Sequence, residues 1–463
     1  DTERGGGAAT RRRPPVKRKR SAAGGGSGGK KKIALQSSFP RRDEWPLSFP
    51  QWPATAQYPD DWLAAEAPHS FLASMRTATP ADVFVENERW TASGIPPLSS
   101  RSADFGAVLY AGGPVWATAF HAEKPFLAVF AAARDTAWHE VGRAYPGAGF
   151  VQLWRWDAAE TRASLLGLLP VRMDYVRQMA WMGDRLAVVG SAGFVEILGT
   201  TVAEMGSVSA TSQEVRADTH QPCCVAWHRK KSYLLYGTVD GSIVVFNDKM
   251  DDWFSFAAHA GVVRCVDVDE ESDCIASGGE DGEVAVWKLG QYRTPLRRFS
   301  LGICFVASVT WLGSAYVVAS TSRGQVYQFA APGNQEEDEQ VRCCLTQRAG
   351  TVWQVASRRS DEMQHLVYFA GSDGTAAEVS VKATGAETRY LRELVQIQKV
   401  DSVDRVKILR GVSGPRVCKD RPVYKSRYVT QCGWWEGESE ACLSMATSGG
   451  YVVLLAQKTE AAP

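Results

Sequence analysis

The stretch AAHAGVVRCVDVDEESDCIASGGEDGEVAVWKL, residues 257–289, decides the fold. It contains three short apolar runs, VVRCVDV, CIASGG and EVAVW, and a polar turn separates each run from the next. Short runs of β-branched and apolar residues, bounded by Gly, Asp and Ser, are typical of strands. The stretch therefore predicts three consecutive antiparallel strands.

The same arrangement recurs when the chain is aligned on one glycine. The copies are GFVQLW from Gly149, GFVEIL from Gly193, GSIVVF from Gly241, GEVAVW from Gly282, GQVYQF from Gly324, GTAAEV from Gly374 and GYVVLL from Gly450. Successive glycines are 44, 48, 41, 42, 50 and 76 residues apart, and most gaps are near the ~40–45 residues of a four-stranded propeller blade. A blade has two apolar faces, which only stacking and ring closure bury. We therefore predict an all-β, seven-bladed propeller over residues 104–457.

Three strands are visible in each repeat, whereas the fourth, outer strand is not. The innermost often carries Trp, as in RQMAWM, CCVAWH and ASVTWL. Two segments are candidates for the strand that closes the ring, VFVENERW (83–90) and FGAVLY (105–110). Two connections are long, 131–147 and 383–430, the latter within or before the last blade. Loops of this length are usually functional or disordered.

Residues 257–289 resemble the WD40 repeat closely. His259, Ser277, Asp281 and Trp287 fall where that family places a structural hydrogen-bonded tetrad. The resemblance implies that these four residues satisfy polar groups inside a blade and have no catalytic role. The other repeats keep the glycine turn but lose members of the tetrad.

The charge is unevenly distributed along the chain. Residues 1–32 hold 11 Lys or Arg and two acids, and the rest of the chain holds 41 basic and 49 acidic residues. The low-complexity composition of 1–32 predicts a disordered basic tail. Residues 33–103 are rich in Pro and aromatic residues and predict an extended arm, and 458–463 form a short C-terminal tail.

The basic tail is the candidate for contact with nucleic acid or with the nuclear import machinery. These basic residues are Arg11, Arg12, Arg13, Lys17, Arg18, Lys19, Arg20, Lys30, Lys31 and Lys32. RRRPP is similar to an AT-hook, but Arg12 stands where that motif has Gly. Three readings remain open, namely an import signal at KRKR, salt-dependent contact with phosphates, or a solvated tail.

We expect neither a metal, nor a cofactor, nor a small-molecule substrate. A spacing that suits metal ligands is found in His220, Cys223, Cys224 and His228. Residues 222–228 also have the pattern of a strand, in which side chains alternate between the two faces and therefore do not converge on one metal ion. The ten cysteines include no C-x-x-C pair and indicate a reducing compartment. No G-x-S-x-G or phosphate-binding loop is present, no apolar run reaches membrane-spanning length, and no secretory signal opens the chain.

The first repeat resembles a more specific family. AGGPVWATAF (111–120), the long connection, and PGAGFVQLWRWD (146–157) resemble the WD40 propeller subunit of general transcription factor IIIC, and the resemblance covers 104–457. It implies a noncatalytic nuclear scaffold that joins other subunits of that factor, the largest subunit above all. That factor recognises internal promoters (the B-box) of tRNA genes for RNA polymerase III. Any DNA contact by this chain would come from its basic tail and loops.

Two other functions stay open. The first is another WD40 adaptor, such as a propeller that binds chromatin or histones, which would need an acidic, aromatic-lined channel. The second is an enzymatic propeller, which would need a metal or convergent carboxylates in the channel.

Overall fold

A computed structural model describes most residues from 95 to 458 and three short strands before them. The described ranges are 55–57, 82–85, 88–90, 95–132, 147–202, 208–216, 221–247, 249–332, 342–359, 364–382, 388–400, 403–413, 417–418, 428–437 and 440–458. All of them belong to one compact unit, residues 46–463. The predicted basic tail, 1–32, lies outside the described residues.

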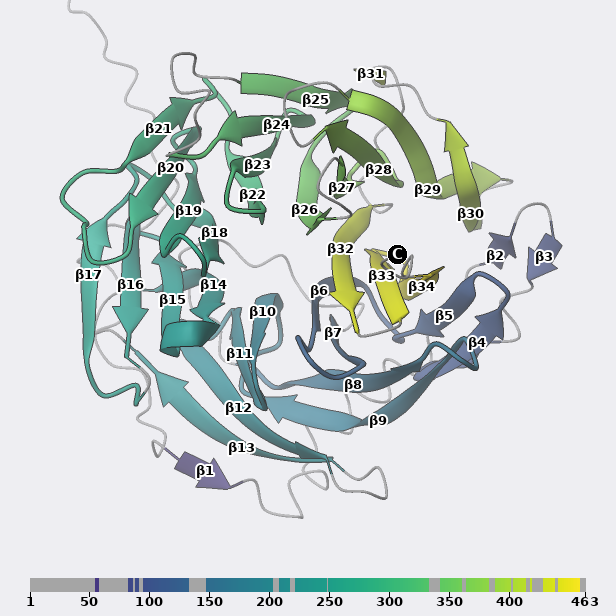
Figure 1. The fold of residues 1–463 in the computed structure, drawn as a ribbon. Helices are drawn as coiled ribbons and strands as arrows, with labels where there is room; N and C mark the ends of the chain where they lie inside the picture. The colour runs from purple at the N-terminus through teal and green to yellow at the C-terminus, as the bar shows by residue number, and fades with distance from the viewer. Residues whose placement is uncertain are drawn as a thin grey trace, which may run out of the picture. The chain divides into compact units, whose positions relative to one another are not determined.

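Seven sheets, which we call blades one to seven, lie around a common centre, and the four strands named below for each blade pair antiparallel (Figure 1). Blade one consists of β6 (Val115–Phe120), β7 (Phe126–Ala131), β8 (Gly149–Asp157) and β9 (Arg162–Val171), and blade two of β10 (Val176–Met182), β11 (Arg185–Gly190), β12 (Val195–Val202) and β13 (Val208–Val215). Blade three consists of β14 (Pro222–His228), β15 (Tyr233–Thr238), β16 (Ser242–Phe246) and β17 (Trp253–Ala257), and blade four of β18 (Val263–Asp269), β19 (Cys274–Gly279), β20 (Glu283–Lys288) and β21 (Arg297–Ser300). Blade five consists of β22 (Val306–Leu312), β23 (Tyr316–Thr321), β24 (Gln325–Ala330) and β25 (Arg342–Arg348), and blade six of β26 (Val352–Arg359), β27 (Gln364–Gly371), β28 (Thr375–Lys382) and β29 (Thr388–Val400). Blade seven consists of β32 (Val429–Glu436), β33 (Glu440–Thr447), β34 (Tyr451–Lys458) and β5 (Gly106–Tyr110). This arrangement confirms the all-β, seven-bladed fold.

The hydrophobic core is divided among the spaces between neighbouring blades. Each of the seven clusters of buried side chains in the described residues joins two successive blades, and one of them joins blade seven to blade one. Strand β19 shows how this arises, because all six of its residues are buried. Ile275 packs toward blade three and its neighbour Ala276 toward blade five, since successive residues of a strand point to opposite faces.

The ring closes through a strand from before the first repeat. β5 pairs antiparallel with β34 as the fourth strand of blade seven, with Val108 opposite Val453 and Tyr110 opposite Tyr451. The rings of Tyr110 and Tyr451 stack with centroids 4.9 Å apart. Of the two candidates, FGAVLY (105–110) is therefore the closing segment. The other candidate contains β2 (Asp82–Val85) and β3 (Glu88–Trp90), which extend the sheet of blade six.

Several blades carry strands beyond the usual four. β30 (Val403–Ser413) follows β29 in blade six, β31 (Val417–Cys418) pairs with β25, β4 (Ser99–Ala103) pairs with β5, and β1 (Thr55–Gln57) pairs with β13. Much of the predicted insertion 383–430 is thus blade strand, including the outer strand of blade six. β4 lies before Asp104, so the sheet of blade seven begins earlier than the sequence suggested.

Helix is scarce in the described part of the chain. It consists of one 3-10 turn, Arg229–Lys231, between β14 and β15. No helix among the described residues has the length and apolar character needed to cross a membrane.

Candidate protein-interaction site at the mouth of the central channel

The first strand of each blade lines the centre of the ring and turns into the second strand at what we call the inner-turn face (Figure 1). Near these turns, residues of five blades surround a hollow of about 330 Å³, which we call the mouth. Its aromatic lining is Phe120, Trp181, Trp227, Trp434 and Trp435. Carboxylates of Asp267, Glu270 and Glu436 also line it. The mouth is thus an aromatic hollow with an acidic rim.

Three of the four tryptophans that line the mouth, Trp181, Trp227 and Trp434, stand at one repeated position, the sixth residue of the inner strand. The seven residues there are Phe120, Trp181, Trp227, Val268, Trp311, Ser357 and Trp434. Three of the indoles donate a hydrogen bond to a backbone carbonyl of the preceding blade, namely Trp181 to Ala119 (3.1 Å), Trp227 to Ala180 (3.0 Å) and Trp311 to Asp267 (3.3 Å). These bonds fix neighbouring inner strands to one another and hold the aromatic walls in place.

Asp267 is the fifth residue of its inner strand and is the charged residue among the seven at that position. The fifth residues of the other inner strands are Ala119, Ala180, Ala226, Thr310, Ala356 and Gly433. The Asp267 carboxylate accepts hydrogen bonds from the backbone N–H groups of Trp311 and Val268, both at 2.9 Å. Burial raises the pKa of Asp267 to about 6, against the effect of these hydrogen bonds. The ring therefore holds a partly desolvated carboxylate at its mouth.

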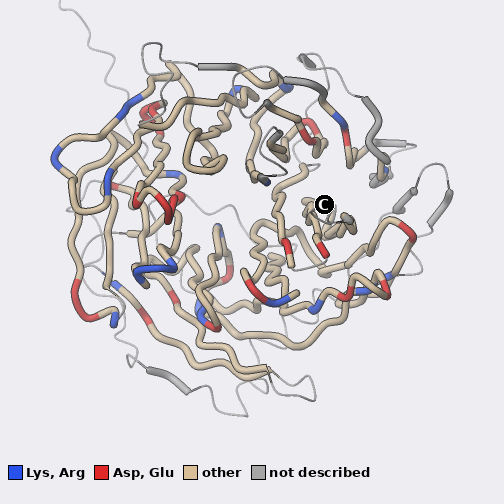
Figure 2. The backbone as a smooth tube through the Cα atoms, in the orientation of Figure 1, with Lys and Arg blue, Asp and Glu red and all other residues tan. Residues whose placement is uncertain are grey.

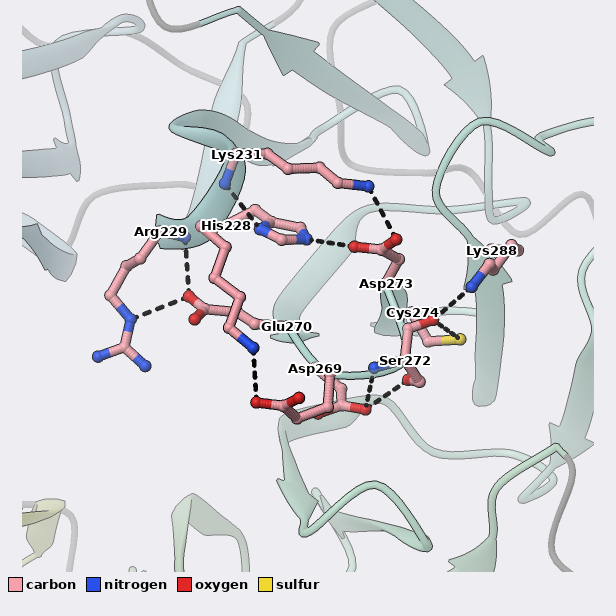
Figure 3. A network of polar contacts seen from close by, with 11 residues as sticks. His228, Arg229, Lys231, Asp269, Glu270, Ser272, Asp273, Cys274 and Lys288 are labelled. Atoms are coloured by element: carbon pink, nitrogen blue, oxygen red, sulfur yellow. Dashed lines mark hydrogen bonds and ion pairs between the residues drawn. The ribbon is translucent and has the colours of Figure 1, made fainter.

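An ion-pair network fixes the rim between blades three and four (Figure 3). The buried His228 places Nε2 2.9 Å from Oδ1 of Asp273, while its Nδ1 accepts the backbone N–H of Lys231 at 3.3 Å. Arg229 donates to Glu270 from its backbone N–H (2.7 Å) and its Nε (2.9 Å). The hydrogen bond from Lys231, followed by that from His228, lowers the pKa of Asp273.

The same network continues along the two turns. Lys230 Nζ lies 2.6 Å from Glu271, and Lys231 Nζ lies 2.8 Å from Asp273. Figure 2 shows that charged residues gather at such turns, while the strands are largely uncharged. A basic turn after β14 is therefore held against an acidic turn after β18, beside the mouth.

His121 follows the inner strand of blade one at the position that His228 has in blade three. Its Nδ1 accepts the backbone N–H groups of Glu123 and Lys124, both at 3.1 Å, so the ring proton is on Nε2. Nε2 lies 3.8 Å from Oδ1 of Asp184, and His121 also has a hydrogen bond with the backbone of Gly183. Burial, and then the charge of Lys124, lower the pKa of His121. The mouth thus contains a buried neutral imidazole.

The predicted tetrad lies on the far side of blade four from this face, at the turn between β19 and β20. His259 Nδ1 lies 3.0 Å from Asp281 Oδ1, and its Nε2 lies 2.9 Å from Ser277 Oγ. The indole of Trp287 donates to the same Oγ at 3.1 Å. Asp281 also accepts the N–H of Ala260 at 2.9 Å. The structure brings the four residues together as one buried chain of hydrogen bonds.

The comparisons with known proteins bear on this repeat. The family model "WD domain, G-beta repeat" matches residues 253–288, which contain all four tetrad residues.

The chain is a seven-bladed β-propeller that contains a WD40 repeat.

A chain of the "Crystal Structure of Mitotic Checkpoint Complex" is similar to this propeller with a TM-score of 0.50 and 17% sequence identity, over 78% of this chain and 94% of that chain. At this identity the likeness concerns the fold. Among curated proteins, none matches the chain.

At two other places in the propeller a buried arginine replaces the tetrad histidine. Arg172 and Arg348 each stand four residues before an inner strand, as His259 does. Arg348 Nε lies 2.9 Å from Asp373 Oδ2, and its Nη2 lies 3.0 Å from Glu393 Oε1. Arg172 is paired in the same way with Glu196 at 3.1 Å and Glu214 at 3.2 Å. At these two places a buried ion cluster therefore takes the place of the tetrad.

Blade one has Gln152 on its third strand, opposite Val129, which stands where the tetrad serine is in blade four. Its side-chain amide donates to the carbonyl of Ala111 at 2.7 Å, and its Oε1 accepts the indole N–H of Trp154 at 3.1 Å. Gln152 and Trp154 belong to GFVQLW, and Ala111 opens AGGPVWATAF. The two parts of the first-repeat resemblance are thus joined by hydrogen bonds.

The remaining predicted residues fall into two groups. The basic candidates from Arg11 to Lys32 and His220 lie outside the described residues. Of the residues considered for a metal, Cys224 directs Sγ to the carbonyl of Val263 at 3.5 Å, while His228 is bound to Asp273. Burial raises the pKa of Cys223 and of Cys224. Within the described residues the group with metal-ligand spacing is His259, Asp281 and Glu283, whose first two members belong to the tetrad.

The sequence carries part of the signal for the mouth. RQMAWM and CCVAWH place Trp181 and Trp227 at the sixth position of their inner strands. Recognising that such positions share one surface requires the register of all seven inner strands, which only the folded ring supplies.

Proposed function

We propose that this WD40 propeller is a noncatalytic docking subunit of a multiprotein assembly. The observation that carries the proposal is the mouth, an aromatic and acidic hollow held by indole hydrogen bonds and turn-to-turn ion pairs. A rigid hollow on a ring whose apolar faces are buried between blades is suited to binding a partner segment. Its carboxylates are not arranged around a nucleophile or a metal group in the described residues.

We further propose that the assembly resembles transcription factor IIIC, with the largest subunit of that factor as the principal partner. The support is the first-repeat resemblance, in which Gln152, Trp154 and Ala111 act together. The basic residues of 1–32 would add contact with DNA, and the chain would work in the nucleus.

Affinity purification from nuclei tests this function. The tagged full chain should recover other subunits of factor IIIC, and nuclease treatment should leave them bound, because the propeller provides the protein contacts. A full-length variant with Arg11, Arg12 and Arg13 replaced by Gln is the matched control for capture through DNA. Recovery of histones without those subunits would overturn the factor IIIC assignment.

The acidic, aromatic mouth favours one second candidate, a propeller that binds a basic segment of chromatin. Carboxylates and indoles are the groups that recognise cationic side chains. In the same purification, this function gives salt-sensitive recovery of histones.

A further inference from the structure

The first element of the inference is the charge balance of the mouth. Two of its carboxylates have cationic partners, since Glu270 is bonded to Arg229 at 2.9 Å and Glu436 to Arg358 at 3.3 Å. Asp267 is bonded to backbone N–H groups and has no ion pair among the described residues. A half-buried carboxylate without a cation favours a cationic ligand, because pairing restores the interaction lost with water.

The second element is the wall around that carboxylate. The faces of two of its indoles are already covered, because Arg358 lies 4.3 Å from the ring centroid of Trp434 and Arg185 lies 5.2 Å from that of Trp227. These contacts leave the carboxylate as the group that a further guanidinium can bind. A hollow of about 330 Å³ has room for a side chain and adjoining backbone, but not for a folded domain.

The third element is an unused donor. Nε1 of Trp435 is buried and has no hydrogen-bond acceptor among the described residues, and Trp435 lines the mouth. Buried N–H groups are nearly always paired in folded proteins. A donor beside a carboxylate matches a peptide, which supplies a carbonyl oxygen together with a side chain.

We propose that the mouth receives an arginine side chain from an extended segment of a partner protein. The guanidinium lies against Asp267, and a peptide carbonyl accepts from the indole of Trp435. This inference deepens the proposed docking function and rests on it. It favours arginine over lysine because a planar guanidinium can donate two hydrogen bonds to one carboxylate.

Peptide titration of the purified full chain tests the inference. The probes are two acetylated, amidated nonapeptides of Gly and Ser, one with a central arginine and the other with a central citrulline, which has a similar shape but no charge. Quenching of tryptophan fluorescence reports binding and calorimetry confirms it. We expect the arginine peptide to bind at least about tenfold more tightly. Equal affinity for both peptides overturns the proposal without any mutation.

Variants then locate the contact. Asp267→Asn should remove the preference for arginine, whereas Glu160→Gln, which changes an exposed acid of blade one, should preserve it. Unchanged preference in folded Asp267→Asn protein contradicts the assignment. The arginine peptide could also bind only after Arg11, Arg12 and Arg13 are changed to Gln. That result would mean that the chain's own basic tail occupies the mouth, and it would overturn the choice of a partner protein as the occupant. These titrations use no other subunit, so their failure is distinguishable from failure of the nuclear purification.

Discussion

Replacing Arg348 tests the idea that buried ion clusters substitute for the tetrad. The Arg348 side chain is 1% exposed, and the carboxylates of Asp373 and Glu393 are 0% and 8% exposed. Arg348 also donates to Thr375 Oγ1 at 2.9 Å. In Arg348→Met the two acids would remain buried without their cation. Removing one partner of a buried ion pair costs roughly 3–5 kcal/mol, and we expect a loss of this size.

Urea unfolding followed by tryptophan fluorescence measures the effect. The matched control is Arg323→Met, since Arg323 is exposed and lies in the same blade. Adding Asp373→Asn and Glu393→Gln to Arg348→Met should recover part of the loss, because the uncompensated charges are then gone. If Arg348→Met unfolds within about 1 kcal/mol of the control, the cluster is not a structural element and the reasoning fails.

Three further predictions concern the tetrad, the mouth and the tail. Ser277→Ala should destabilise the protein by about 2–4 kcal/mol, because His259 and Trp287 lose their shared hydrogen-bond partner. In a double-mutant cycle with Trp287→Phe, the two losses of stability should be coupled, and losses that simply add would contradict the tetrad. Burial raises the pKa of Asp267 in the folded protein to about 6, above its ordinary value of 3.8, so its contribution to stability is present below about pH 4 and lost as pH rises to 6. Asp267→Asn should therefore be more stable at pH 7 by about 1–2 kcal/mol, less than the roughly 3 kcal/mol of the full shift because the carboxylate is hydrogen-bonded. A gain that persists at pH 3.5 would argue against this cause. Neutralising Lys30, Lys31 and Lys32 should weaken DNA binding and flatten its salt dependence, whereas an unchanged slope in electrophoretic titrations would exclude phosphate contacts by these residues.

The outer strands show where the sequence ceased to be informative about the fold. The first three strands of each blade are apolar because both of their faces are covered by neighbouring blades. Outer strands are more exposed, as in β17 and β21, where most residues are exposed or half-buried. Their polar composition shows no clear alternation of apolar and polar residues. For this reason the sequence predicts a long insertion at 383–430, where the structure has β29. Which segment closed the ring was also undecided, because pairing of β5 with β34 joins distant parts of the chain.

The sequence by itself determined the repeat, the number of blades and the position of the tetrad residues, because these features depend on side chains within one blade. His259, Ser277, Asp281 and Trp287 lie within a single stretch of chain, and local strand pairing brings them together. Only the tertiary structure decided the mouth. Phe120 and Trp434 come from the first and last blades, and they line one hollow because ring closure places those inner strands side by side.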